Sequence, residues 1–218
     1  MSTTKQPLIS IITVVYNGAV TLERTILSVI GQTYTNIEYI IIDGGSKDGS
    51  IDIIKKYQAH IAYWVSEPDN GIYDAMNKAV SYANGEWIIF MNAGDTFYTN
   101  DILSSIFNAE TIKTYNSYGI LYGDRCNIYH NRHEIIPSAD IHNIEKYMPF
   151  CHQATLTRTH LLHKMPFDTR YKLGADYDFF LKNYRNGVQF KKLNICLANY
   201  EAEQGVSTIH LRLAKTSV

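Results

Sequence analysis

The feature that most restricts the fold of this chain is a regular alternation of short hydrophobic runs with segments of helical periodicity. Four runs rich in Ile, Val, Tyr and Trp have the length and composition of buried strands. They span residues 8–15, 37–42, 61–65 and 87–91. Between them, apolar residues recur at helical spacing in residues 21–30, 50–57 and 72–83. This βαβαβαβ order predicts an α/β protein with a mostly parallel central sheet flanked by helices.

An Asn or Asp residue stands at or just past the end of each expected strand. Asn17, Asp43, Asp69 and Asp95 follow one another at intervals of 26 residues. Crossover connections bring the carboxyl ends of parallel strands to one edge of the sheet, where open α/β folds bind ligands. Asx residues are also common loop starters and helix caps, so any one of them could be structural. The four together favour a binding site at that edge.

After Asp95 the alternation becomes less regular. We expect helices over residues 102–115 and 177–184, and strands at 120–122, 126–136, 152–157, 190–193 and 195–201. The turn Gly123-Asp124 separates the first two of these strands. No Pro-, Gly- or Ser-rich linker divides the chain, so we expect one domain over residues 1–218.

Composition excludes several classes of protein. The 218 residues are 45% hydrophobic and 19% charged, which is typical of a globular chain and not of a disordered one. The formal net charge of −1 provides no positive field for nucleic acid, so we expect no nucleic-acid partner. The cysteines, Cys126, Cys151 and Cys196, form no C-x-x-C pair and suit a reducing compartment. Without a signal-like or membrane-spanning apolar run, we expect a cytoplasmic protein.

Familiar catalytic motifs are missing. The glycine-rich residues 43–50 fit neither G-x-G-x-x-G nor G-x-x-x-x-G-K-[ST], so dinucleotide and P-loop sites are excluded. The chain has no G-x-S-x-G nucleophile elbow.

Four segments together resemble the family 2 glycosyltransferases, in order and in spacing. They are residues 9–17 (ISIITVVYN), 40–50 (IIIDGGSKDGS), 66–78 (SEPDNGIYDAMNK) and 85–95 (GEWIIFMNAGD). Residues 151–154 (CHQA) and 173–182 (LGADYDFFLK) are similar to the acceptor-side segments of that family. The resemblance extends over residues 8–207. It implies a GT-A (Rossmann-like) fold, with a nucleotide-sugar-binding half at about 8–98 and an acceptor-binding, catalytic half at about 99–218.

The resemblance also implies roles at the donor site. The nucleotide would contact the backbone near Thr13 and Val15 and the side chains of Asp43 and Asp69. Tyr16 and Asn17 would complete that wall, although Tyr16 could equally pack in the core. Asn92 would suit a ribose hydroxyl.

The metal motif of the family, Asp-x-Asp, is altered here to Asn92-Ala93-Gly94-Asp95. By resemblance, Asp95 is the single carboxylate for a divalent cation, Mn²⁺ or Mg²⁺, with water and the diphosphate completing the coordination. Alternatively, Asp95 only caps the next segment. Asp124 and His210 are weaker candidates for the same ion.

The catalytic base aligns by resemblance with Asp176, and Ala175 occupies the Glu position of the usual Glu-Asp pair. Asp178 is the rival, but two residues along a helix rotate a side chain by about 200°, so only one of the two can face the cleft. His152 and Gln153 would line the acceptor pocket, or His152 could be an ordinary core or surface histidine.

These expectations combine into an inverting, metal-dependent glycosyltransferase. It would take a nucleoside-diphosphate sugar, with UDP favoured and GDP as the alternative base. The acceptor would be a glycan, in enzymes of this kind often lipid-linked in surface polysaccharide synthesis, so peripheral contact with the inner face of the cell membrane is left open. A sugar nucleotidyltransferase and a non-catalytic glycan-binding module are the alternatives.

Overall fold

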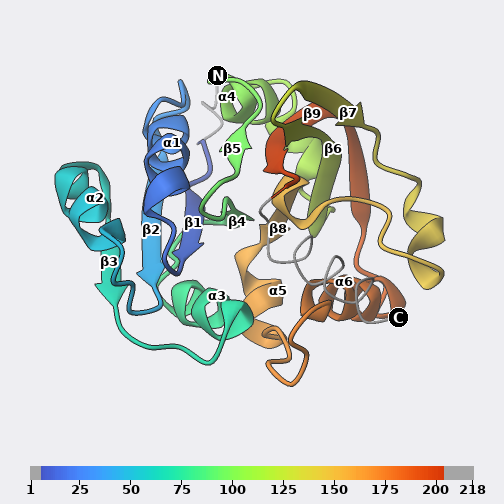
Figure 1. Ribbon diagram of the computed structural model, residues 1–218. Helices are drawn as coiled ribbons and strands as arrows, with labels where there is room; N and C mark the ends of the chain where they lie inside the picture. Colours follow the sequence, from blue (N-terminus) through green and yellow to red (C-terminus); the bar gives the residue numbers. More distant parts are fainter. Residues whose placement is uncertain (1–5, 204–218) are drawn as a thin grey trace.

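The computed structural model describes residues 6–203 and contains one mixed sheet (Figure 1). Its strand order is β3-β2-β1-β4-β8-β6-β9-β5, with β7 paired to β6. The first four strands are β1 (Ile9–Val15), β2 (Ile37–Asp43), β3 (Tyr63–Ser66) and β4 (Trp87–Phe90). They pair in parallel, as the sequence predicts.

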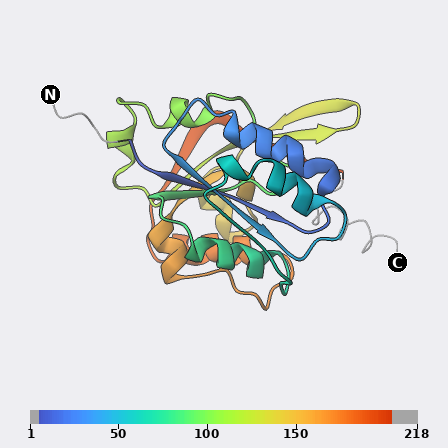
Figure 2. The ribbon, with the colours of Figure 1, turned by 90° about the vertical axis from the view of Figure 1, so that its left-hand side faces the viewer.

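Three helices connect these strands and cover both faces of the sheet. They are α1 (Ala19–Ile30), α2 (Ser50–Lys56) and α3 (Ile72–Ser81). Figure 2 shows α1 and α2 on one face and α3 on the other. Successive residues of β1 alternate between the faces, because side chains of a strand point alternately up and down. Ile9 and Ile11 pack in the cluster that contains α1, and Ile12 and Val14 pack in the cluster that contains α3.

The second half of the chain extends the same sheet. Its strands are β5 (Thr96–Phe97), β6 (Ile120–Tyr129), β7 (Arg132–Ile136), β8 (Thr155–Arg158) and β9 (Phe190–Glu201). Its helices are α4 (Ile102–Ile106), α5 (Thr159–Lys164) and α6 (Ala175–Arg185). β8 pairs antiparallel with β4, and β6 pairs in parallel with β9. The division of the chain into a donor half and an acceptor half stays a prediction.

The expected turn at Gly123-Asp124 is wrong. β6 continues through these residues, and the hairpin to β7 lies later, between Tyr129 and Arg132. β9 is likewise one strand where two were expected. The pairing of β6 with β9 shifts register on either side of Asp124. Gly123 therefore marks a bulge and close backbone approach inside a strand, which is a common use of glycine.

The expected helix over residues 102–115 is also wrong, because it breaks after Ile106. The side chain of Asn108 accepts hydrogen bonds from the backbone N–H groups of Glu110 (2.9 Å) and Thr111 (3.1 Å). Such local side-chain bonds compete with the helical pattern. A short 3-10 helix follows at Ile112–Tyr115. At the expected strand 152–157, a 3-10 turn (His152–Ala154) precedes β8.

We predict that Gly123→Ala destabilises the fold. A Cβ atom at Gly123 would lie 2.7 Å from the carbonyl oxygen of Ile195 and 2.9 Å from a methyl carbon of Leu197. Overpacking of this kind costs about 1–3 kcal/mol of unfolding free energy. Urea denaturation of the variant should show this loss. An unchanged midpoint would contradict the close approach of β9 to Gly123.

Candidate active site

The loop after β2 holds one carboxylate, that of Asp43, in a fixed orientation. Its Oδ2 accepts hydrogen bonds from the N–H groups of Gly45 (3.1 Å) and Ser46 (2.9 Å) and from the hydroxyl of Ser66 (2.6 Å). Asp43 is fully buried, and its other oxygen, Oδ1, has no hydrogen-bond partner among the described residues. A buried oxygen of this kind requires a donor, because an unmet acceptor is costly away from water. Oδ1 of Asp43 is therefore an unmet hydrogen-bond acceptor in this loop.

Two further predicted residues lie close to this loop. A Cβ atom at Gly44 would lie 2.5 Å from Oδ2 of Asp69 and 3.3 Å from a ring carbon of Tyr16. The structure thus brings Tyr16, Gly44 and Asp69 together beside Asp43. Tyr16 is 68% exposed, so its ring does not pack in the core. It is available to a planar ligand.

Asn17 connects two loops at this edge. Its side-chain oxygen accepts a hydrogen bond from the N–H of Lys47 (3.0 Å), and its own N–H donates to the hydroxyl of Ser46 (2.7 Å). Its φ of 50° lies in the left-handed region, which Asn tolerates better than most residues. In this arrangement Asn17 holds the glycine-rich loop in place.

Thr13 and Val15 lie inside β1 and are buried. The hydroxyl of Thr13 donates to the carbonyl oxygen of Met91 (2.7 Å), and the carbonyl oxygen of Val15 accepts from the N–H of Gly44 (2.9 Å). These bonds join β1 to the loops after β4 and β2. A direct contact of either residue with a nucleotide stays a prediction.

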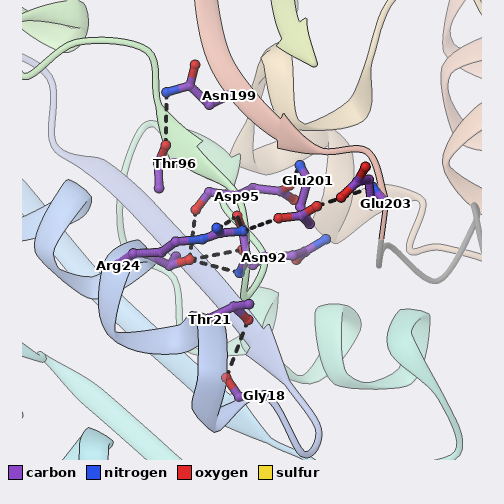
Figure 3. Close-up of polar contacts among 11 residues, drawn as sticks. Gly18, Thr21, Arg24, Asn92, Asp95, Thr96, Asn199, Glu201 and Glu203 are labelled. Carbon is purple, nitrogen blue, oxygen red and sulfur yellow. Dashed lines mark hydrogen bonds and ion pairs between the residues drawn. The ribbon is translucent and has the colours of Figure 1, made fainter. Parts of the chain in front are cut away.

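The altered metal motif forms a loop after β4 that α1 and β9 hold from two sides (Figure 3). Thr25 of α1 accepts from the N–H of Gly94 (3.0 Å) and donates to the carbonyl oxygen of Asp95 (2.7 Å). Arg24 donates to the carbonyl oxygen of Gly94 and forms an ion pair with Glu201. Gly94 has a φ of 108°, which favours glycine. The backbone of this loop is therefore fixed.

The carboxylate of Asp95 is only 5% exposed. Its Oδ1 accepts from the N–H of Glu201 (3.0 Å) at the end of β9. Burial raises the pKa of Asp95 to about 7, while the Glu201 N–H, the Gln153 side chain and the charge of Arg24 oppose this shift. Burial disfavours the charged form of a carboxyl, so a nearby positive charge would be stabilising.

Asp95 and Asn92 offer oxygen atoms, which suit a hard cation such as Mn²⁺ or Mg²⁺. The side-chain oxygen of Asn92 is buried without a hydrogen-bond partner among residues 6–203. Within that range no group of three or more His, Cys, Asp and Glu residues is arranged to hold a metal. Asp124 instead accepts two hydrogen bonds from Ser138, and His210 lies outside the described residues. The residues fit a cation that takes most of its ligands from elsewhere.

Asp176 is the second residue of α6, which begins after Gly174. Its Oδ1 accepts a hydrogen bond from the hydroxyl of Tyr73 (2.9 Å), and its Oδ2 lies 3.9 Å from Nδ1 of His152. Asp178 has a different partner, Lys182 (2.6 Å), one turn further along the helix. The two carboxylates thus have separate environments, as helical spacing predicts, and the structure brings only Asp176 together with His152.

The segment Cys151–Gln153 lies between the two candidate carboxylates. The thiol of Cys151 donates to the side-chain oxygen of Gln153 (2.8 Å). Burial raises the pKa of Cys151 to about 11, and the negative charges of Asp95 and Asp176 both add to the shift. This thiol is therefore close enough to both carboxylates to be influenced by each. Asp95 and Asp176 therefore both lie near this segment, and their membership of one site stays a prediction.

His152 is buried, and its imidazole is surrounded by aromatic rings. The ring centroids of Phe90, Phe167 and Phe180 lie 5.0, 5.7 and 6.1 Å away. Burial lowers the pKa of His152 and favours the neutral ring. Neither ring nitrogen has a hydrogen-bond partner among the described residues. A surface role is excluded by this burial, and the acceptor-pocket role stays a prediction.

Sequence reasoning did not find Arg24, Glu201 or Tyr73. Tyr73 lies within the segment 66–78 that carries the resemblance, which was its available signal. Arg24 and Glu201 stand in no motif, and 177 positions separate them in the sequence. Only the fold brings them to the loop of Asp95.

The model of the family described as Glycosyl transferase family 2 matches residues 10–177. The chain belongs to this family. A PGL/p-HBAD biosynthesis glycosyltransferase of Mycobacterium bovis (strain BCG / Pasteur 1173P2) is 29% identical over 206 residues, covering 92% of this chain and 79% of the relative. An uncharacterized glycosyltransferase of Rickettsia bellii is 30% identical, in an alignment that covers 93% of this chain and 31% of the relative.

Solved structures confirm the GT-A fold that the sequence predicts. TarS of S. aureus, in complex with UDP-GlcNAc, is 19% identical with a TM-score of 0.75, covering 92% of this chain and 60% of that one. The mannosyltransferase PcManGT of Pyrobaculum calidifontis, in complex with GDP-Man and Mn²⁺, is 20% identical with a TM-score of 0.72. This match covers 97% of this chain and 62% of that one. This chain thus spans about three fifths of the TarS chain that it matches.

We predict that Asp95 makes stability depend on pH when metal is removed with EDTA. The folded chain keeps a proton on Asp95 up to about pH 7, whereas the unfolded chain releases it near the ordinary value of 3.8. Unfolding free energy therefore falls as pH rises through this window. Asp95→Asn removes this loss. The stability of the variant relative to wild type should grow by about 2–3 kcal/mol between pH 5 and pH 8, at about 1.4 kcal/mol per pKa unit.

Urea denaturation at both pH values measures this difference. Asp52→Asn, a change at an exposed residue of α2, is the control and should follow wild type at both. A difference between Asp95→Asn and wild type that is the same at pH 5 and pH 8 would contradict the prediction.

Proposed function

We propose that this chain transfers a sugar from a nucleoside diphosphate to a glycan acceptor, with inversion at the anomeric carbon. The observation that carries the proposal is the buried, unpartnered Oδ1 of Asp43 beside Tyr16 and Asp69. A fixed carboxylate oxygen suits a nucleobase that offers a ring N–H. Uracil and guanine have such a group, and cytosine has none. Both a UDP-sugar, which we favour, and a GDP-sugar, the alternative, therefore suit this site.

The structural neighbours support this donor class. TarS is solved with UDP and with UDP-GlcNAc, and PcManGT is solved with GDP-Man and Mn²⁺. In this chain the ring of Tyr16 would stack on the base, and Asp69 would accept a hydrogen bond from a hydroxyl or N–H of the nucleoside.

Asp95 would hold the cation, Mn²⁺ or Mg²⁺, and Asn92 would offer its side chain to a ribose hydroxyl. The ion would neutralise charge on the diphosphate as it departs. The fixed loop backbone, bonded to Thr25 and Arg24, keeps Asp95 in place for this role. Gln153, whose side chain lowers the pKa of Asp95, would connect the cation side of the site to the acceptor side.

Asp176 would be the general base. The acceptor hydroxyl attacks the anomeric carbon from the face opposite the diphosphate, and its proton passes to Asp176. A carbon–oxygen bond to the acceptor forms, and the bond to the diphosphate breaks with its electron pair on the departing oxygen. Asp176 thus takes up the proton, and the diphosphate takes up the electron pair. His152, next to Asp176, would limit the acceptor pocket.

We further propose a lipid-linked acceptor and a place at the inner face of the cell membrane. The mycobacterial relative is assigned by its name to the biosynthesis of PGL/p-HBAD, which supports a glycan product. None of the described helices is both long and apolar enough to cross a bilayer. Contact with a membrane would therefore be peripheral for residues 6–203.

Asp43→Asn tests the donor site. Asn retains one oxygen for the N–H groups of Gly45 and Ser46 but replaces the second oxygen with an NH₂ donor, which repels a ring N–H. We expect UDP affinity, measured by calorimetry with Mn²⁺, to fall about 10- to 150-fold, the range for a lost hydrogen bond to a charged group. CDP affinity should change less, because the corresponding ring nitrogen of cytosine is an acceptor.

Asp48→Asn is the matched control for this test. Asp48 lies in the same loop and also accepts backbone N–H bonds, from Ala19 and Ser50, but both of its oxygens have partners. UDP affinity should remain near that of wild type. Equal losses in the two variants, or none in Asp43→Asn, would contradict the donor site and would favour the glycan-binding alternative.

Asp176→Asn tests the base. The variant keeps its shape but cannot take the proton, so turnover should fall about 10²- to 10⁴-fold while nucleotide affinity stays near wild type. Asp178→Asn should retain most activity, because that side chain pairs with Lys182. The measurement is release of nucleoside diphosphate from UDP- and GDP-sugars, with water taking the sugar in place of the acceptor. Loss of activity only in Asp178→Asn would assign the base to Asp178.

A further inference from the structure

One face of α3 contacts both ends of the segment from Phe167 to Gly174, which leads to Asp176. Tyr73 and Asn77 lie one helical turn apart on this face. The side chain of Asn77 donates to the carbonyl oxygen of Phe167 (2.8 Å) and accepts from the N–H of the same residue (2.9 Å). This pair of bonds fixes the start of the segment. Tyr73 contacts its other end.

The hydroxyl of Tyr73 makes two hydrogen bonds of opposite sense. It accepts from the N–H of Gly174 (3.0 Å) and donates to Oδ1 of Asp176 (2.9 Å). Burial and the negative charge of Asp176 raise the pKa of Tyr73 above its ordinary value, so the phenol keeps its proton. Because Gly174 already supplies the hydrogen on one side, the single phenol proton is directed at Asp176.

This bond leaves one oxygen of Asp176 for chemistry. Among the described residues, Oδ2 has no hydrogen bond within range, and Nδ1 of His152 lies 3.9 Å away, beyond hydrogen-bond distance. The side chain of Asp176 is 24% exposed, so Oδ2 is not sealed in the core. A bond to Oδ1 selects one rotamer of the carboxylate and thereby sets the direction of Oδ2.

We propose that Tyr73 is a positioning residue that aims Oδ2 of Asp176 at the acceptor hydroxyl. This inference rests on the proposed function, in which Asp176 takes the acceptor proton. Tyr73 itself would touch neither donor nor acceptor. A base must approach its proton within hydrogen-bond distance, and small misplacements of reacting groups lower rates strongly.

The same helix also begins at the donor side. Oδ1 of Asp69 accepts from the N–H of Gly71 (2.8 Å), the residue before α3. Tyr73 follows two positions later. The first turn of α3 therefore joins Asp69, expected at the nucleotide, to Asp176, expected at the acceptor. The separation of donor and base would be set by this rigid turn.

Tyr73→Phe removes only the hydroxyl, because the ring still packs against Phe167 at a centroid distance of 5.6 Å. Tyr177→Phe is the matched control. Tyr177 is on α6 itself, and its hydroxyl donates to the carbonyl oxygen of Ile144 (2.7 Å) with no bond to Asp176. Both variants lose one tyrosine hydroxyl that holds α6, so a merely structural role would affect them alike.

Release of UDP from UDP-GlcNAc and of GDP from GDP-mannose, with Mn²⁺ and with water in place of the acceptor hydroxyl, should separate the two. For Tyr73→Phe we expect kcat to fall about 10- to 100-fold with KM within about twofold, since a misplaced group slows the chemical step rather than binding. Tyr177→Phe should keep kcat within about twofold. In the Asp176→Asn background, Tyr73→Phe should cause no further loss, because residues that act as a unit are not additive.

Wild-type kcat in Tyr73→Phe, together with an inactive Asp176→Asn, would overturn this inference and leave the proposed function intact. An active Asp176→Asn would instead overturn the proposed base. A crystal structure of Tyr73→Phe provides a readout that needs no substrate. We expect the carboxylate of Asp176 to leave its wild-type rotamer while the backbone of α6 stays in place, and an unmoved carboxylate would also overturn the inference.

Discussion

The burial of two carboxylates, those of Asp43 and Asp95, at one edge of the sheet is the constraint that shapes this site. A carboxylate removed from water is strongly destabilising unless hydrogen-bond donors surround it. Backbone N–H groups supply such donors to both. The partly exposed carboxylates of Asp69 and Asp176 accept hydrogen bonds from a backbone N–H and from a phenol. Each carboxylate is thereby oriented before any ligand arrives. Preorganised groups need no rearrangement when charge develops in a reaction.

The segment Cys151–Gln153 lies near both Asp95 and Asp176. The Gln153 side chain lowers the pKa of Asp95, and Nδ1 of His152 lies 3.9 Å from Oδ2 of Asp176. The last two residues of the segment belong to the 3-10 turn that precedes β8, the strand that joins the parallel part of the sheet to the rest. An open groove of about 860 Å³ lies at the opposite edge, between Gly85, Tyr118 and Arg158, and none of the candidate site residues lines it.

The sequence predicts the first half of the fold well, because hydrophobic runs and helical periodicity are local signals. The positions of Asp43, Asp69 and Asp95 follow from the ends of those runs. The second half was harder to predict. Gly123-Asp124 is a pair typical of turns, but it lies inside a strand, where the backbone of β9 approaches Gly123 closely. Asn108 ends a helix because its side chain accepts hydrogen bonds from the backbone that follows.

The local sequence pattern does not predict the residues that hold the site in place. Tyr73 and Asp176 are 103 positions apart, and Asp95 and Glu201 are 106 positions apart. Their bonds exist only after the sheet has formed and α1, α3 and β9 have reached their places. Sequence motifs mark the residues expected to face the ligand, whereas the residues that orient them follow from the packing.

A crystal structure with a UDP-sugar and Mn²⁺ is the decisive experiment, because it places base, cation and sugar at once. We expect the ring N–H of uracil at Oδ1 of Asp43, the cation at Asp95, and Asp176 on the side of the anomeric carbon opposite the diphosphate. A nucleotide bound in the groove at Gly85 and Arg158, or a sugar whose reactive face points away from Asp176, would contradict this arrangement.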